Sequence, residues 1–191
     1  LNILRNLSEV DVSKTLVETF KKAINDLTIL NKGEAEIRDS IKISKCRPFV
    51  AKEQGYLIPK KSLFNKIIGD SELELEFANF LESCDDIISY VKNYFAVNFK
   101  IDYQNHNGEI SNYYPDFIVK RNESEIYIVE TKGLEDLDVP LKIERLDQWC
   151  KDVNAKNTGV TYHWLFVKDD EFREKIPRNF QELIKKFHKS Q

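Results

Sequence analysis

Apolar and polar residues alternate with two different periods along the chain, and the period separates helices from strands. A helix is predicted from about Val12 to Leu30, where Leu16, Phe20, Ile24 and Leu27 recur at helical spacing. Residues 34–69 mix scattered apolar positions with breaks such as Pro48, which predicts a β-rich connector.

Two helices are expected from about residue 71. Ser71 and Glu74 have the spacing of a capping box, and the residues that follow form one apolar face: Leu73, Phe77, Phe80, Leu81 and Cys84. Asp85 and Asp86 are expected to cap a second helix, whose apolar positions are Ile87, Ile88, Val91 and Tyr94.

From residue 96 the pattern changes to the alternation that is typical of strands. Strands are predicted at 97–103, 113–120 and 126–132, with turns at 105–108 and 122–124. A helix opened by Asp138 and Pro140, a fourth strand at 162–167 and a final helix at 179–186 follow. The order from residue 71, α-α-β-β-β-α-β-α, predicts an α/β fold in which helices flank a mixed central sheet.

Composition indicates the class of protein and its environment more clearly than its function. The net charge of −3 does not favour a nucleic-acid partner, and no apolar run reaches the roughly 18 residues of a membrane helix. Three widely spaced cysteines are expected to be free thiols in a reducing cytoplasm. The chain begins at Leu1 and contains no Met, so we expect a piece of a longer protein. Residues 1–69 would be an upstream helix and connector, and residues 70–191 a separate domain.

The strand at 126–132 carries the most informative residues. Ile126 and Ile128 point to one face and their neighbours to the other, so both faces are apolar and the strand is expected at the centre of the sheet. Glu130 and Lys132 continue the Ile126 face, where a charge is costly unless it is paired or bound to metal. A hairpin would bring Asp116, which follows Pro115, beside them.

These three residue types have a shared chemistry. Carboxylate oxygens hold Mg²⁺, and a bound metal ion activates water and stabilises phosphate charge. A lysine can orient that water or the scissile phosphate. The main-chain carbonyl of Thr131 is a further candidate metal ligand. The alternative is structural: a salt bridge between Glu130 and Lys132, with Asp116 capping a turn.

The two segments around these residues resemble the PD-(D/E)xK nucleases. The runs are Asn112-Tyr113-Tyr114-Pro115-Asp116-Phe117-Ile118-Val119 and Ile128-Val129-Glu130-Thr131-Lys132-Gly133. Over about residues 40–187 the chain is more closely similar to the C-terminal nuclease region of the restriction subunit of type III restriction-modification enzymes.

The resemblance implies a restriction-endonuclease-like fold and cleavage of double-stranded DNA with Mg²⁺, for which Mn²⁺ can substitute. It also implies a prokaryotic cytoplasmic enzyme with a methyltransferase partner subunit and an ATP-driven motor. No phosphate-binding Gly-x-x-x-x-Gly-Lys-Ser/Thr motif occurs in this sequence, so ATP would act only through a motor outside it.

The family often adds an acid from the helix that precedes the sheet. Glu76 is our prediction among Glu72, Glu74 and Glu76, because it flanks the apolar face and Glu74 already belongs to the capping box. A solvated helix face is the alternative.

On the outer face of the 138–153 helix, phosphate contacts are predicted for Lys142, Arg145 and Gln148, again with a solvated face as the alternative. Two rival functions stay open: another PD-(D/E)xK nuclease, of DNA repair or recombination, and an inactive module that binds DNA or a subunit.

Overall fold

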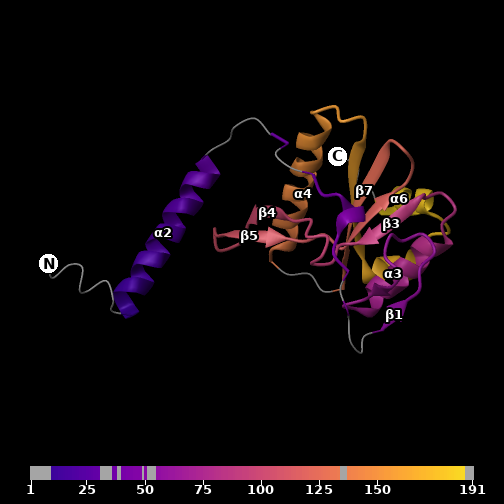
Figure 1. The fold of residues 1–191 in the computed structure, drawn as a ribbon, viewed down its shortest axis with the longest axis horizontal. Helices are drawn as coiled ribbons and strands as arrows, with labels where there is room; N and C mark the ends of the chain where they lie inside the picture. Colours follow the sequence, from indigo (N-terminus) through magenta and orange to yellow (C-terminus); the bar gives the residue numbers. More distant parts are fainter. Residues whose placement is uncertain are drawn as a thin grey trace.

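The structure, a computed structural model, describes residues 10–30, 36–37, 40–48, 50, 55–133 and 137–187 (Figure 1). The elements, in chain order, are α2 (Val10–Leu30), η1 (Ile43–Lys45), β1 (Tyr56–Leu57), β2 (Ile67–Ile68), α3 (Glu72–Ser83), β3 (Ser89–Lys92), β4 (Ile101–Gln104), β5 (Ile110–Tyr113), β6 (Phe117–Lys120), β7 (Glu125–Lys132), α4 (Val139–Asn154), β8 (Thr161–Lys168), α5 (Asp169–Lys175) and α6 (Phe180–Phe187).

A four-stranded sheet, in the order β3-β6-β7-β8, forms the centre of the molecule. Strand β6 runs antiparallel to both β3 and β7, whereas β8 pairs in parallel with β7 after the crossover through α4. The predicted central position of the 126–132 strand is confirmed, because β7 pairs on both edges. The mixed α/β fold is confirmed with it.

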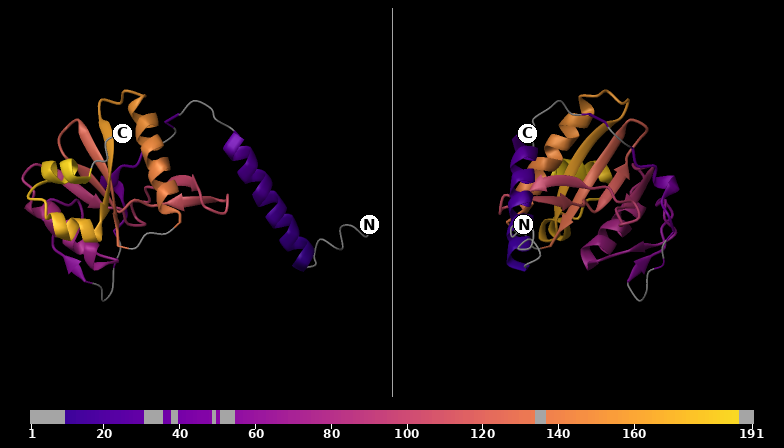
Figure 2. Two further views of the ribbon diagram at one scale, coloured as in Figure 1. Left: turned by 180° about the vertical axis from the view of Figure 1, so that it is seen from behind. Right: turned by 60° about the vertical axis from the view of Figure 1, so that its left-hand side comes forward.

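Helices lie on both faces of the sheet (Figure 2), and each face has its own hydrophobic core. Helices α3, α5 and α6 cover one face, where Phe77, Phe172 and Phe180 pack on Val129 of β7. Helix α4 and the β4–β5 hairpin cover the other, where Leu146 and Tyr113 pack on Ile128. The alternation along β7 therefore sends Glu130 and Lys132 toward the α4 side and Thr131 toward the α3 side.

Two sequence predictions next to the sheet were wrong in detail. Residues 85–94 do not form a second helix, because Tyr90 and Val91 belong to the edge strand β3. Asp86 does cap a helix, but it is α6: its carboxylate accepts hydrogen bonds from the backbone N–H groups of Phe180 and Gln181. The single strand predicted at 113–120 is two strands, β5 and β6, separated at residues 114–116.

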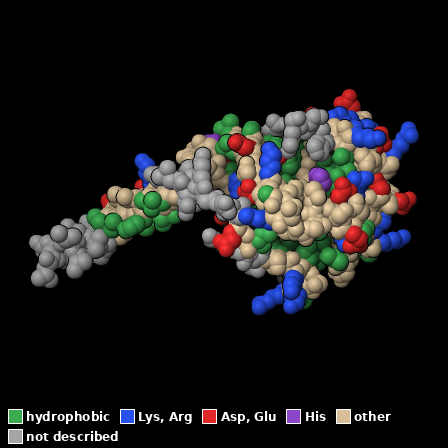
Figure 3. Space-filling view, turned by 90° about the horizontal axis from the view of Figure 1, so that it is seen from above, with side chains coloured by type: hydrophobic (Ala, Val, Ile, Leu, Met, Phe, Trp, Pro, Cys, Tyr) green, Lys and Arg blue, Asp and Glu red, His purple; other side chains and the backbone are tan. Residues whose placement is uncertain are grey.

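The predicted N-terminal helix is confirmed as α2, which stands apart from the sheet in Figure 1. Its apolar face is open to solvent, since Phe20 is 65% and Leu27 68% exposed, and Figure 3 shows hydrophobic side chains along it. Between residues 36 and 69 the described residues form η1 and two strands of two residues each, less β-structure than predicted. Ile67 of β2 is fully buried against α3. None of the described helices is long and apolar enough to span a membrane.

Candidate active site

The turn between β5 and β6 fixes the position of Asp116. Pro115 has no N–H to continue a strand ladder, and the side chain of Asn93 holds the bend. Its amide group donates to the carbonyl oxygens of Pro115 (2.8 Å) and Phe99 (2.7 Å), and its backbone N–H donates to the carbonyl of Asp116 (2.7 Å). Asn93 lies in the segment that the sequence assigned to a helix end, so sequence reasoning missed it.

The structure brings Asp116 and Glu130 to adjacent positions of neighbouring strands. Phe117 of β6 is paired with Val129 of β7. Asp116, which precedes Phe117, therefore lies next to Glu130, which follows Val129. The Asp116 carboxylate accepts hydrogen bonds from the backbone N–H and the hydroxyl of Thr131, both at 2.7 Å. The Glu130 carboxylate accepts one from the Tyr113 hydroxyl at 3.1 Å. Neutral donors therefore orient both acids.

Both carboxylates hold their protons more tightly than usual. Burial raises the pKa of Asp116 to about 6, although the hydrogen bonds from Thr131 act in the opposite direction. Burial, and then the negative charge of Asp116, raise the pKa of Glu130 to about 8. Two anionic groups that repel each other in a low-dielectric site favour the binding of a cation. The acids present thus fit a divalent metal ion.

Water or main-chain oxygens would have to complete such a site. In the part of the chain that the structure describes, no three of those residues gather closely enough to hold a metal ion. Mg²⁺ commonly binds through one or two carboxylates and keeps several waters, so a two-carboxylate site is compatible with it.

Lysines line the end of the sheet where the two acids lie. The charges of Lys132 and Lys142 both lower the pKa of Glu130, so both lie within its electrostatic reach. Lys132 is also paired in register with Lys168, the last residue of the parallel strand β8. Lys168 carries no signal in the sequence, because only the crossover register places it beside Lys132.

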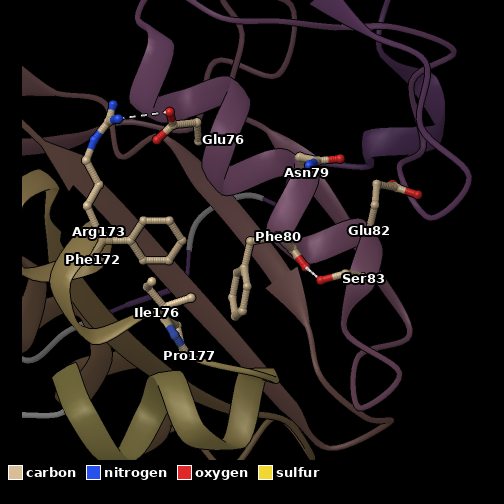
Figure 4. Close-up of a pocket in the computed structure, with 9 residues that line it drawn as sticks. All are labelled: Glu76, Asn79, Phe80, Glu82, Ser83, Phe172, Arg173, Ile176 and Pro177. Carbon is tan, nitrogen blue, oxygen red and sulfur yellow. Dashed lines mark hydrogen bonds and ion pairs between the residues drawn. The ribbon is translucent and has the colours of Figure 1, made fainter.

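Of the three acids considered in α3, the structure places Glu74 next to this site and not the predicted Glu76. Glu74 is buried, and its negative charge raises the pKa of Asp116. Glu76 instead points toward Arg173 of α5, with 3.0 Å between their charged atoms (Figure 4). It lines a cavity of about 630 Å³ between α3 and α5, where Phe80 and Phe172 are its neighbours.

Glu74 forms the predicted capping box and a further ion pair. The Ser71 hydroxyl accepts from the Glu74 backbone N–H, as predicted (3.2 Å), and the Glu74 carboxylate accepts from the backbone N–H of Asp70 (2.9 Å). The same carboxylate also lies 2.8 Å from the ammonium group of Lys92. A residue can cap a helix and face the site at once, which the sequence pattern does not reveal.

The three residues predicted to contact DNA differ in their present contacts. Arg145 donates to the backbone carbonyl of Asp102 (3.1 Å) and lies 3.9 Å from the Asp152 carboxylate, which also accepts from Gln148 (2.8 Å). Arg145 therefore fastens α4 to the β4–β5 hairpin. Lys142 lies over the ring of Tyr103, 5.8 Å from its centre, and nearer to the acids.

A comparison with known families addresses the activity of this site. A family model described as an endonuclease domain matches residues 60–164, which is more than half of the 191 residues. The match includes both carboxylates, Lys132 and Glu74. No curated protein and no solved structure matches the chain.

Proposed function

Because the chain belongs to the endonuclease-domain family, we propose that it hydrolyses DNA phosphodiester bonds with Mg²⁺, as the nuclease part of a type III restriction enzyme. The observation that carries the proposal is the buried carboxylate pair, Asp116 and Glu130, whose pKa values are both raised. A bound divalent cation stabilises such a pair most when both carboxyl groups are ionised near neutral pH.

Both residues of the pair are metal ligands in this proposal, and each is oriented by a different neighbour. Asp116 and Glu130 would hold the metal ion, together with the carbonyl oxygen of Thr131. Thr131 keeps Asp116 oriented through its N–H and hydroxyl, and Tyr113 does the same for Glu130. A bound Mg²⁺ lowers the pKa of water and stabilises the negative charge that develops on the phosphate.

Lys132 would hold the attacking water or a phosphate oxygen beside the pair. It follows Glu130 by two residues on the same face of β7, and its charge acts on Glu130. Its neighbour Lys168 and the α4 residue Lys142 add positive charge at the same end of the sheet. This local positive charge supports double-stranded DNA as the partner even though the net charge of the chain is −3.

The assignment to type III restriction rests on the similarity of the segments around Asp116 and Glu130 to that family. It brings two further proposals, a methyltransferase partner subunit and an ATP-driven motor elsewhere in the longer protein. Under this proposal ATP is needed to deliver DNA and not for the hydrolysis step, so concentrated protein should nick DNA without it.

Plasmid nicking by the purified chain with Mg²⁺ tests the activity. Lys132→Ala should lower the nicking rate by about 10²-fold or more, the effect of removing one charged group aimed at the transition state. Lys120→Ala is the matched control, because Lys120 ends β6 at the opposite end of the sheet and pairs with Glu123 (2.6 Å). Nicking that survives Lys132→Ala would overturn the assigned role. A chain that neither nicks DNA nor binds millimolar Mn²⁺ would instead be a binding module.

A further inference from the structure

A buried lysine occupies the centre of a second group of charges beside the carboxylate pair. The Lys92 ammonium lies 2.8 Å from a Glu74 oxygen and 2.9 Å from an Asp70 oxygen, and the Lys92 side chain is only 4% exposed. The three residues come from β3, from the start of α3 and from the loop that precedes it. The N–H of Asp70 also donates to Glu74, so the two acids are joined by a hydrogen bond as well as by the shared cation.

This charge group and the carboxylate pair adjoin each other. Lys92 is paired in register with Phe117, the residue after Asp116. The next residue along the chain, Asn93, donates its backbone N–H to the Asp116 carbonyl. The charges of Glu74 and Lys92 both act on Asp116, with opposite signs. Four acids therefore lie in one region, and a cation of the protein itself sits between two of them.

We propose that the ammonium group of Lys92 acts as a built-in cation for Asp70 and Glu74, so that the site takes up one divalent metal ion, at Asp116 and Glu130. The inference rests on the proposed function, because it counts the ions that the proposed site binds. Lys92 is a positioning residue in this scheme: it touches neither DNA nor metal, but its charge holds Glu74 and acts on Asp116.

The physical reason is the cost of buried charge. Glu74 and Lys92 leave water, with side chains only 11% and 4% exposed, so each needs the opposite charge beside it. The ammonium group is a compact point charge that also meets Asp70, whose side chain is 72% exposed. Lys92 is covalently attached, so it compensates Asp70 and Glu74 at any metal concentration. A metal ion at that position would have to displace an ammonium that has almost no solvent to move into. The neighbouring pair, oriented by Thr131 and Tyr113, is then the remaining candidate position for an ion.

Counting bound Mn²⁺ on the 191-residue chain by electron paramagnetic resonance tests the proposal. The wild-type chain should bind one Mn²⁺ and Lys92→Met two. Adding Glu74→Gln to Lys92→Met should return the count to one, because the second ion loses its carboxylate. Lys92→Arg retains the charge and should stay at one. Lys120→Met, which removes a lysine from an ion pair remote from the site, should also leave one.

The counts separate this inference from the proposed function. A wild-type chain that binds no Mn²⁺ refutes the metal pair, whereas the increase from wild type to Lys92→Met reports on Lys92 alone. If Lys92→Met does not fold, Lys92→Gln removes the charge but retains a donor for Glu74 and should show the same increase. Two ions on the wild type, or no increase in a folded variant, would overturn the inference. So would two variants that stay unfolded in Mn²⁺, because the second ion should then replace the lost charge.

Discussion

Two pairs of acids lie side by side in this protein, and the fold treats them in opposite ways. Asp70 and Glu74 share the buried ammonium of Lys92. Although burial acts to lower the pKa of Lys92, its hydrogen bonds to those acids raise it overall. Asp116 and Glu130 are oriented by a threonine and a tyrosine, and their pKa values are raised. The first pair shares a cation of the chain itself, whereas under our proposal the second pair binds a cation from solution.

Isosteric substitutions in the two pairs should have opposite effects on stability. Glu74→Gln removes the buried one of the two anionic partners of Lys92 and leaves only Asp70, so it should lower the free energy of unfolding by about 1.5–3 kcal/mol. Asp116→Asn removes a repelling charge and retains an oxygen for Thr131, so stability at pH 8 in EDTA should be unchanged or higher. Urea unfolding of the three chains at one pH provides the comparison.

Asp116→Asn should also differ from the wild type in activity. Asp116→Asn should abolish Mg²⁺-dependent nicking, because an amide is a poor ligand for Mg²⁺ and one of two carboxylates is lost. Its unchanged or higher stability excludes unfolding as the cause. If Asp116→Asn still nicks plasmid, or if it is destabilised as much as Glu74→Gln, the two pairs do not differ in the way described here.

The stability of the metal-free chain should decrease as the pH rises. The pKa of Glu130 is raised from 4.5 to about 8 and that of Asp116 from 3.8 to about 6, so the folded chain binds these protons more tightly than the unfolded chain does. Their contribution is complete below about pH 4 and lost as the pH passes 6 and then 8. Unfolding free energies at pH 5 and pH 8 in EDTA should differ by on the order of 3 kcal/mol.

Metal should remove most of this pH dependence. Mg²⁺ binds the ionised pair, so it should stabilise the chain strongly at pH 8 and little at pH 5. The double variant Asp116→Asn/Glu130→Gln serves as the control. Its free energy of unfolding should depend little on pH, both in EDTA and in Mg²⁺. Asp138 acts in the other direction, since its hydrogen bonds from His106 lower its pKa to about 2, but that contribution is complete above pH 5. A wild-type profile that rises from pH 5 to pH 8 in EDTA would contradict the carboxylate pair described here.

Sequence reasoning placed Asp116 beside Glu130, but it did not place Lys92 beside Asp70 and Glu74. Asp116, Glu130 and Lys132 stand next to apolar runs whose alternation predicts β7 directly and β6 only as the end of one longer strand, and β7 is the longest strand before the crossover. The faces of β7 follow from the same alternation: Glu130 shares a face with Ile128, and Thr131 lies on the other. A local pattern was enough because these residues are neighbours within a single hairpin.

Lys92 was missed because its strand was mistaken for a helix. Ile87, Ile88, Val91 and Tyr94 have helical spacing, but a segment this short also fits a strand, and pairing with β6 decides the outcome. Without β3, Lys92 and Asn93 have no predicted position near Asp116. Glu74 was assigned to the capping box alone for a related reason: its ion pair joins residues 18 positions apart, on elements that only the tertiary fold brings together.

The smallest effect is expected from Tyr113→Phe, which removes a neutral donor and no charge. The Tyr113 hydroxyl hydrogen-bonds to Glu130 and lowers the pKa of that carboxyl, so its loss should raise the pKa further. Mn²⁺ affinity at pH 7 should fall by about fivefold, corresponding to about 1 kcal/mol. The acidic limb of the nicking rate should move to higher pH.

Tyr103→Phe is a closely matched control for that change. The Tyr103 hydroxyl donates to Asp138 at 2.9 Å, so the substitution removes the same chemical group from a carboxylate that lies outside the pair. Mn²⁺ affinity and the pH profile should then match the wild type. Equal shifts in the two variants would mean that the tyrosines act through the packing of the β4–β5 hairpin. A shift in Tyr113→Phe alone would show that a neutral hydrogen bond tunes Glu130 directly.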